Sequence, residues 1–454
     1  MLVVQNEALL DLLRFHYTSE KVRAIRRELS DKGVFSFPTL NNGLFPAASV
    51  TGETAYTGYA SVWVRDNVHI AHAHYVLGEA DVAARTACAL MDHFRKQCSR
   101  CRTMISRRGV SPKNVMCRPH IRFDGLTLGD IDEKWPHAQN DALGYFIWFY
   151  SKLACKGLIK PEQTDLDTLW LLAKYLKSVA FWKDEDSGHW EEIRKISASS
   201  IGAVVAGLLE LRRLWTSSPL NAKHRRPRHL LDELIAKGRA SLRRILPAEC
   251  IQAKSPQRRR YDAALLFLIY PLEVITGKIA DRVLQDVLEN LQGDHGVRRY
   301  VGDSYWAPDY KKKVTAEKRT IDYSENMVAR DTMAQRGNEA QWCIFDPIIS
   351  AIYGLRYQAT RNGEFFRLQT KYLNRSLGQL TSPDSGFPEW RCPELYYIED
   401  GRRVPSDATP LLWTQANLML ALKVMRDSVQ SSGDASRVQS GAVTQEGCET
   451  EVIP

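Results

Sequence analysis

Helical periodicity is the feature that most constrains what this chain can fold into. Apolar residues recur at positions i, i+3, i+4 and i+7 over much of the sequence, which is the pattern of amphipathic helices. The clearest case is Ser199–Trp215, where the large apolar side chains form one stripe. This pattern predicts about twelve helices, which begin near residues 4, 67, 80, 138, 165, 197, 228, 260, 280, 342, 362 and 408.

Strand signals are few and short, as in Val34–Phe37. The sequence shows no strand–helix alternation of the kind that builds a parallel sheet. It also contains neither G-x-G-x-x-G nor a P-loop, the glycine-rich motifs that bind nucleotides. The sequence therefore predicts an all-α fold.

Long connections rich in glycine, proline, aspartate and aromatic residues separate the predicted helices. Such long loops are uncommon in a compact protein and are often functional. Several of the 11 tryptophans lie in them. An exposed tryptophan is costly unless it packs on something, and both a sugar ring and the protein core are suitable partners. The loops are 33–64, 102–136, 183–196, 293–341 and 381–407, and their tryptophans are Trp63, Trp135, Trp190, Trp306 and Trp390.

Composition and charge argue against several classes of protein. Hydrophobic residues make up 44% of the chain, which is enough for a large buried core. The 62 Lys and Arg residues against 53 Asp and Glu give a modest net charge of +9. The basic clusters at 225–228, 258–260 and 311–313 lie in short polar connections without interleaved aromatic residues, so we interpret them as solvated surface. We expect no nucleic-acid partner.

The sequence also lacks the signals of secretion, membrane insertion or metal binding. Residues 1–27 have no uninterrupted apolar core of a signal peptide, and no apolar run is long enough to span a membrane. The nine cysteines are scattered, and Cys98 and Cys101 form a lone CxxC without a second pair at zinc spacing. We therefore expect a soluble, reduced, cytoplasmic protein without a metal site or a membrane partner.

Two loops place carboxyl groups beside aromatic residues, and glycosidic bonds are usually cleaved by two carboxyl groups. The first loop is Asp184–Glu192, with five carboxylates and Trp190. Like charges and an aromatic neighbour raise the pKa of a carboxyl group, as a general acid requires. The alternative is a solvated acidic turn before a helix N-terminus, which the pattern alone favours.

The second loop is Gly386–Tyr397, in which Glu389 and Glu394 each follow a proline. Here the alternative is a pair of ordinary loop carboxylates bound to Arg391 or Arg402. A third segment, Trp63–Asn67, places an arginine next to an aspartate, and such a pair can grip sugar hydroxyls. Its alternative is an aspartate that caps a helix beside a salt bridge.

Five motifs, in the same order along the chain, resemble the glucoamylase family, glycoside hydrolase family 15. Trp63–Asn67 and Pro393–Tyr397 are also typical of the glycosidase-like domain of the phosphorylase kinase α and β subunits, which the chain resembles even more closely. The five motifs are Trp63–Asp66 (W-x-R-D), Trp135–Asp141 (W-x-x-x-Q-x-D), Trp190–Glu192 followed by Ser199 and Ser200, Gly296–Tyr300, and Pro393–Glu394 followed by Trp413.

The resemblance implies a single (α/α)6 barrel over residues 1–428, with six inner and six outer helices. Residues 429–454 are rich in Ser, Gly, Gln and Glu and have almost no large apolar side chains before Val452, so their composition predicts a disordered tail. It implies an inverting mechanism, with Glu191 as general acid and Glu394 as general base. The two carboxyl groups are then expected on opposite walls of one cleft, roughly 6.5–9.5 Å apart. The residues that match sugar-binding positions are Trp63, Arg65, Asp66, Trp135, Trp190, Glu192 and Arg299.

The expected substrate is an intracellular α-linked gluco-oligosaccharide, and no cofactor is implied. The alternative is a catalytically silent sugar-binding protein with a regulatory role, like the phosphorylase kinase domain. Glu389 stays an alternative base. We expect like charges in Asp184–Glu192 to raise the pKa of Glu191, and Arg391 to keep Glu394 ionised. The sequence indicates no protein partner.

Overall fold

The computed structural model describes residues 2–49, 58–106, 111, 113–217, 226–254 and 257–442, with only the backbone for 226, 227 and 432–442. Ten of the twelve predicted helices begin within four residues of an observed helix. The helix predicted near residue 4 is instead a short 3-10 helix, η1 (Glu7–Leu9), followed by α1 (Ser19–Asp31). The helix predicted near residue 260 is a short pair, η6 (Ala263–Leu265) and α9 (Leu266–Ile269).

Six helices form a closed inner ring, because each contacts the next and the last contacts the first. Most residues of α2 and of α5 are buried, so burial extends around the whole of each helix rather than along one face. In ring order the six are α2 (Val64–Leu77), α5 (Asn140–Cys155), α7 (Ala198–Ser217), α9, α13 (Phe345–Thr360) and α15 (Leu412–Ala442).

Each inner helix has a partner helix outside the ring. In α10 the buried apolar residues recur at three- and four-residue spacing, as expected for a helix with one solvated face. The partners are α3 (Ala80–Lys96), α6 (Gln163–Ser178), α8 (Arg226–Ile245), α10 (Gly277–Asn290), α14 (Gly363–Gly378) and α1. The fold is therefore an (α/α)6 barrel, as predicted.

Glycines allow the inner helices α5 and α7 to approach closely. A Cβ atom on Gly144 would lie 2.4 Å from the carbonyl carbon of Ala203, and one on Gly207 would lie 2.6 Å from the carbonyl oxygen of Gly144. Real side chains do not tolerate such distances, so the backbones can only meet here without a side chain between them. The contact fixes the spacing of this part of the ring.

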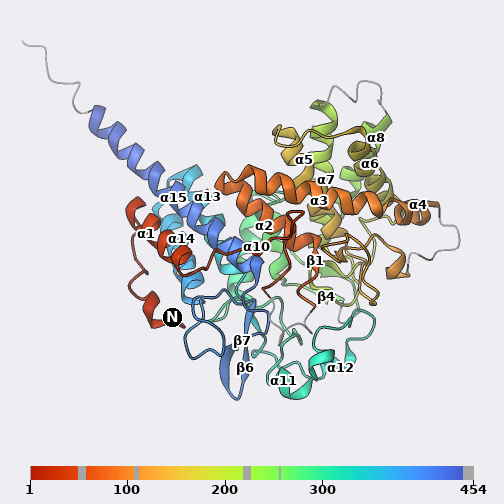
Figure 1. Cartoon of the computed structure of the whole chain (residues 1–454). Helices are drawn as coiled ribbons and strands as arrows, with labels where there is room; N and C mark the ends of the chain where they lie inside the picture. Colours follow the sequence, from red (N-terminus) through yellow and green to blue (C-terminus); the bar gives the residue numbers. More distant parts are fainter. Residues whose placement is uncertain are drawn as a thin grey trace, which may run out of the picture.

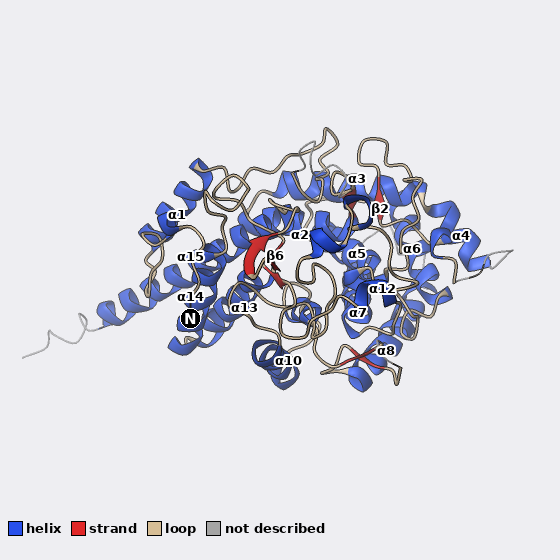
Figure 2. Cartoon of the chain, turned by 90° about the horizontal axis from the view of Figure 1, so that it is seen from below, coloured by secondary structure: helices blue, strands red, loops and turns tan. Residues whose placement is uncertain are grey.

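The long loops gather at one end of the barrel. Figure 1 shows α11 (Tyr310–Lys313), α12 (Val328–Asp331) and the hairpin of β6 (Leu395–Glu399) and β7 (Arg402–Pro405) together along the lower edge of the molecule. Seen from that side in Figure 2, loops fill the centre and helices surround them. The remaining short elements are α4 (Cys98–Ser106), η3 (Val115–Cys117), η4 (Gly188–Trp190), η7 (Ala316–Lys318), β1 (Val62–Trp63), β2 (Arg122–Phe123), β3 (Cys250–Ile251), β4 (Arg258–Arg259) and β5 (Gln341–Trp342).

The strands are short and tie loops to one another. β1 pairs antiparallel with β2, which places Trp63 opposite Arg122. β5 pairs with β6, and β6 pairs with β7, in a three-stranded antiparallel sheet that positions the chain just after Glu394. These pairings connect loops that lie far apart in the sequence.

A second, smaller core joins the two ends of the described chain. Apolar residues of α1, such as Ile25 and Leu29, pack against α14 and α15. Val429 also packs on this cluster, and α15 continues to Ala442, so the first part of the predicted disordered tail is helical. Residues 443–454 of that tail lie outside the described residues. No helix in the described ranges is long and apolar enough to cross a membrane.

Candidate active site

A pocket opens at the loop-rich end of the barrel. Arg65 and Asp66, in the first turn of α2, and Trp413, in the first turn of α15, line its wall. Its volume is about 110 Å³, well below the roughly 300–1,000 Å³ of pockets for drug-sized ligands. This size favours a ligand that inserts one small unit, such as a single sugar ring.

Glu191 and Glu394 both line this pocket, although they are about 200 residues apart. Glu191 follows the 3-10 helix η4 and has φ of 58°, in the left-handed region that non-glycine residues rarely adopt. Trp63 Nε1 donates a hydrogen bond of 3.1 Å to Glu191 Oε1, and Arg65 Nη2 donates one of 3.3 Å to the same oxygen. A strained backbone held by such partners is typical of functional positions.

The pKa of Glu191 is raised, mainly because burial disfavours the charged carboxylate, while Arg65 opposes the shift. The expected cause, repulsion by the neighbouring carboxylates of Asp184–Glu192, is wrong. Those carboxylates have partners of their own: Arg118 Nη1 lies 2.5 Å from Asp184, and Gln252 donates to Glu185 at 2.7 Å. The direction of the shift is the one that was expected, and burial accounts for it.

Glu394 lies just before β6 and accepts a hydrogen bond of 2.6 Å from the Tyr59 hydroxyl. Ser406 Oγ lies 3.4 Å from its second carboxyl oxygen. Burial raises the pKa of Glu394 to about 7, and the Tyr59 hydrogen bond and the positive charge of Arg299 lower it from a still higher value. The expectation that Arg391 keeps Glu394 ionised is wrong, because the Arg391 guanidinium donates to the backbone oxygen of Lys32 instead.

Glu389, the alternative base, does not line the pocket. Its side chain is exposed and accepts a hydrogen bond of 3.4 Å from Asn6 Nδ2. The geometry therefore favours Glu394 over Glu389 for chemistry in this pocket.

Arg65, Asp66 and Arg299 converge on the pocket. Arg65 also holds the buried carboxylate of Asp141 at 2.6 Å, so its guanidinium links the pocket to the inner helix α5. Asp66 is desolvated, and this burial raises its pKa to about 7. Neither of the first two residues merely braces the barrel, since both reach the pocket wall.

The three tryptophans predicted to bind sugar, Trp63, Trp135 and Trp190, line the pocket. The Arg122 guanidinium lies 5.0 Å from the ring centre of Trp63 and 4.1 Å from that of Trp135. Trp190 Nε1 donates a hydrogen bond of 2.9 Å to Asp262 Oδ1. Because these contacts fix the rings from outside the pocket, the walls are formed before any ligand arrives.

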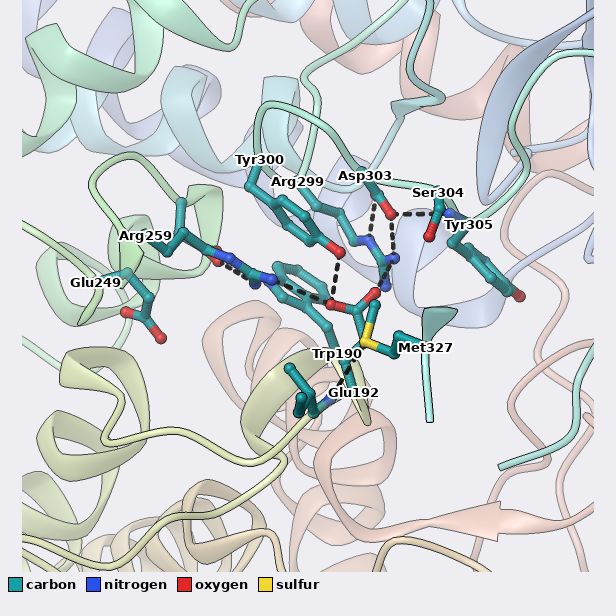
Figure 3. A network of polar contacts seen from close by, with 12 residues as sticks. Trp190, Glu192, Glu249, Arg259, Arg299, Tyr300, Asp303, Ser304, Tyr305 and Met327 are labelled. Carbon is teal, nitrogen blue, oxygen red and sulfur yellow. Dashed lines mark hydrogen bonds and ion pairs between the residues drawn. The ribbon is translucent and has the colours of Figure 1, made fainter. Parts of the chain in front are cut away.

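Glu192 differs from the other predicted site residues, because it is fully buried and does not line the pocket. Its carboxylate accepts hydrogen bonds from Tyr300 at 2.6 Å and Arg299 at 2.8 Å, and it also binds Arg259, as Figure 3 shows. Arg330 Nη2 lies 2.5 Å from it. The three guanidinium groups hold the pKa of Glu192 well below its usual value. Glu192 therefore stands behind the pocket wall and positions arginines that do line it.

The chain matches a known protein family over most of its length. The model of glycosyl hydrolases family 15 matches residues 30–343. The chain belongs to glycosyl hydrolase family 15. This family 15 match includes the loop with Glu191 and ends just before α13, so Glu394 lies beyond it.

Curated relatives of this family 15 chain include regulatory proteins. A probable phosphorylase b kinase regulatory subunit alpha of Caenorhabditis elegans is 25% identical over 404 residues, 80% of this chain and 30% of that protein. The skeletal muscle subunit alpha of Oryctolagus cuniculus is 25% identical over 66% of this chain and 24% of its own length. The chain thus spans less than a third of the length of these relatives.

Among solved structures, a glycosidase variant in complex with glucose shares the fold of this family 15 chain. The likeness has a TM-score of 0.61 at 16% sequence identity, and covers 90% of this chain and 99% of the other. At this identity the likeness concerns the fold alone.

Sequence reasoning missed several residues of the family 15 pocket. Tyr59 donates to Glu394, and Tyr305 lies beside it in the pocket wall, with the two hydroxyl oxygens 3.3 Å apart. Residues 319–323 and Arg330 form another part of the wall. Tyr59 lies close to the W-x-R-D motif, which is a signal that was available, whereas nothing in the 293–341 loop marks Arg330.

Within the described residues, no group of three or more His, Cys, Asp or Glu side chains is arranged to hold a metal ion. Cys98 and Cys101 both lie in α4, and Cys101 is buried. Neither residue lines the pocket.

Proposed function

We propose that this protein is an inverting glycoside hydrolase that removes one terminal sugar from an α-linked gluco-oligosaccharide. One observation carries the proposal: two carboxyl groups with raised pKa, Glu191 and Glu394, reach one small pocket from loops about 200 residues apart. Two such groups are the minimum equipment for cleaving a glycosidic bond. Membership in a family of glycosyl hydrolases supports the same reaction.

In this proposal Glu191 is the general acid. Its raised pKa favours the protonated form of the carboxyl group, and that proton goes to the glycosidic oxygen as the bond to the leaving sugar breaks. Trp63 and Arg65 contact Glu191 Oε1, which orients the carboxyl group.

Glu394 is the general base, and it takes a proton from the water that attacks the anomeric carbon. Because its pKa is about 7, it is ionised in only about half of the molecules at pH 7 and in most at pH 8. The Tyr59 hydroxyl donates to the carboxylate and so favours the ionised form. We expect its carboxyl group to lie roughly 6.5–9.5 Å from that of Glu191, which leaves room for the water.

The remaining pocket residues are proposed to hold the terminal sugar. Arg65, Asp66 and Arg299 present charged donors and an acceptor to hydroxyl groups, and Trp63 and Trp135 offer apolar faces. Glucose is present in one structure with this fold, which agrees with such a subsite. We propose that Glu192 acts indirectly, by fixing the guanidinium groups of Arg299 and Arg330 through its ion pairs.

The second candidate is a sugar-binding regulatory protein, and the curated relatives favour it because they are named as kinase regulatory subunits. Both candidates require a sugar-sized pocket, so sugar affinity does not distinguish them. Only the hydrolase requires an acid and a base that act together. We also propose that the protein is cytoplasmic, a location that suits either role. The cysteines of the described ranges are all free, which agrees with a reducing compartment.

A hydrolysis screen over maltose, isomaltose, trehalose and longer glucans tests the proposal. We expect turnover of at least one substrate by the wild-type protein. Glu191→Gln should lower kcat about a hundredfold or more while glucose binding, measured by calorimetry, stays within a few-fold. Glu389→Gln changes an exposed carboxylate outside the pocket and should retain activity. Glucose binding by the wild type without turnover of any α-glucoside would instead support the regulatory role.

A further inference from the structure

A second recess, remote from the sugar pocket, lies between α1 and α15. Figure 1 shows these two helices beside each other, and their residues are in contact. The recess has a volume of about 420 Å³, and its floor is formed by the buried side chains of Val22 and Leu422. Its remaining lining residues are Arg23, Arg26, Arg27, Ser30, Lys423 and Arg426.

The cations of the recess form two rows that face each other. Arg23, Arg26 and Arg27 occupy positions i, i+3 and i+4 of α1, so they share one helix face with Ser30. Lys423 and Arg426 are three residues apart on α15. Like charges at such spacings destabilise a helix by roughly 0.2–0.5 kcal/mol per pair, so an anion bound between the two rows would reduce the repulsion within each row.

The protein supplies little negative charge to this recess. Asp427 contacts Lys423 and also lies 3.9 Å from Arg426. Among the described residues, no ion pair is recorded for the guanidinium groups of Arg23, Arg26 and Arg27. The three arginines around Glu192, by contrast, all share that carboxylate. Among the described residues, the recess therefore brings several cationic side chains together, and Asp427 is the carboxylate that pairs with two of them.

We propose that this recess binds a soluble phosphate ester that carries two or more phosphate groups. Guanidinium groups bind phosphate oxygens through paired hydrogen bonds, and two facing rows can hold two phosphates at once. The volume of the recess falls within the range of small-molecule sites. Lys423, with only 17% of its side chain exposed, lies deep enough to favour a small ligand that enters the recess over a flat surface that lies across it.

The lining argues against two other anionic partners. No aromatic ring is among the lining residues, and aromatic rings are what single-stranded nucleic acids stack on. A membrane surface would need exposed apolar residues beside the cations. Phe15, which precedes α1, is 98% exposed but is not part of the lining. A lipid headgroup that carries phosphate groups still presents the same chemistry, so the experiment has to distinguish it from a soluble ester.

Calorimetric titration of the full chain at low salt provides the test, with pyrophosphate and inositol hexakisphosphate as probes. We expect saturable one-to-one binding that weakens as salt is added. Arg26→Glu and Lys423→Glu should each weaken binding at least tenfold, because each replaces a cationic hydrogen-bond donor by a carboxylate that repels phosphate. Arg243→Glu makes the same charge change at an exposed residue of α8, outside the recess, and should leave affinity within about twofold.

Thermal melting controls for folding. Arg26→Glu relieves repulsion between like charges on α1, so it should melt at or above the temperature of the wild type. Lys423→Glu also loses the ion pair with Asp427, so it should melt somewhat lower but still in one cooperative transition. Arg26→Gln, which removes the charge without reversing it, should show the same loss of affinity in a milder form. The inference is overturned if the wild type binds neither probe saturably, or if Arg243→Glu weakens binding as much as the recess variants. Binding confined to vesicles that contain phosphatidylinositol bisphosphate, or to a DNA oligonucleotide, would overturn the inference as well.

Discussion

Glu191 and Glu394 share one pocket, yet different neighbours set the charge on each carboxyl group. Glu191 is contacted by an indole N–H and a guanidinium group, whereas Glu394 is contacted by two hydroxyl groups. A hydroxyl can be removed without leaving an unpaired charge, so Glu394 offers the cleaner single-residue experiment.

Tyr59→Phe removes the hydroxyl that donates to Glu394. That hydrogen bond lowers the pKa of Glu394, so its loss should raise the pKa above about 7. A general base acts only when ionised, and the acidic limb of the kcat/KM profile should therefore move to higher pH. Activity should fall more at pH 6 than at pH 8.

The pH profile of Tyr323→Phe is the matched control for this prediction. Tyr323 also lines the pocket, but its hydroxyl donates to the backbone oxygen of Lys318 rather than to Glu394. An equal displacement of the acidic limb in both variants would mean that Tyr59 does not act through Glu394.

At the residue scale, the sequence predicted which side chains line the pocket better than it predicted the partners of those side chains. Of the nine candidate site residues, all except Glu192 line one pocket. The expected pairing of Arg391 with Glu394 was wrong, because closeness in sequence says little about where a long side chain points. Arg391 donates to the backbone oxygen of Lys32 instead. Glu192 follows Glu191 directly, yet the left-handed backbone at Glu191 helps to send the two carboxyl groups in different directions.

At the scale of the helix, the contact between α5 and α7 gives a sharp stability prediction. In Gly144→Ala the new methyl group would meet backbone atoms of Ala203 and Val204 at 2.4–2.6 Å, so the two helices must separate. We expect a loss of about 1–3 kcal/mol, measured by denaturant unfolding.

Gly363→Ala is the control, because no atom lies within 4 Å of the added methyl group in the first turn of α14. That variant should be neutral or slightly more stable, since alanine favours helix. If Gly144→Ala proves as stable as Gly363→Ala, the close approach of the inner helices is not a constraint on the barrel.

Periodicity located the helices because each one buries a face or a whole surface, and burial dictates which positions are apolar. It failed for η6 and α9, which together are too short to complete the periodic pattern, although α9 belongs to the inner ring. It also missed α4, whose sequence is polar and carries only two buried residues, Cys101 and Met104. The 293–341 loop contains α11, η7 and α12, and their short lengths again leave no periodic signal.

At the scale of the whole molecule, the pocket is assembled from segments spread over most of the chain. Glucose bound there should slow amide hydrogen exchange in several separate stretches at once, measured by mass spectrometry at saturating and zero glucose. The protected stretches should include 59–66, 189–192, 299–305, 319–330 and 394–413. Peptides from α1 should not change, and protection limited to one stretch would place the sugar elsewhere.

The closed ring and the second core also determine how late during synthesis the N-terminal segment can complete its native contacts. Asn6 donates to the backbone oxygen of Thr381, 375 residues later, and Ile25 and Leu29 of α1 share one core with apolar residues of α14 and α15. A ribosome adds about 5–20 residues per second, so the N-terminal segment waits roughly 20–75 seconds for its partners. During that interval Ile25 and Leu29 lack the cover that α14 and α15 provide in the finished protein. The newborn chain therefore exposes this part of its second core until α15 leaves the ribosome.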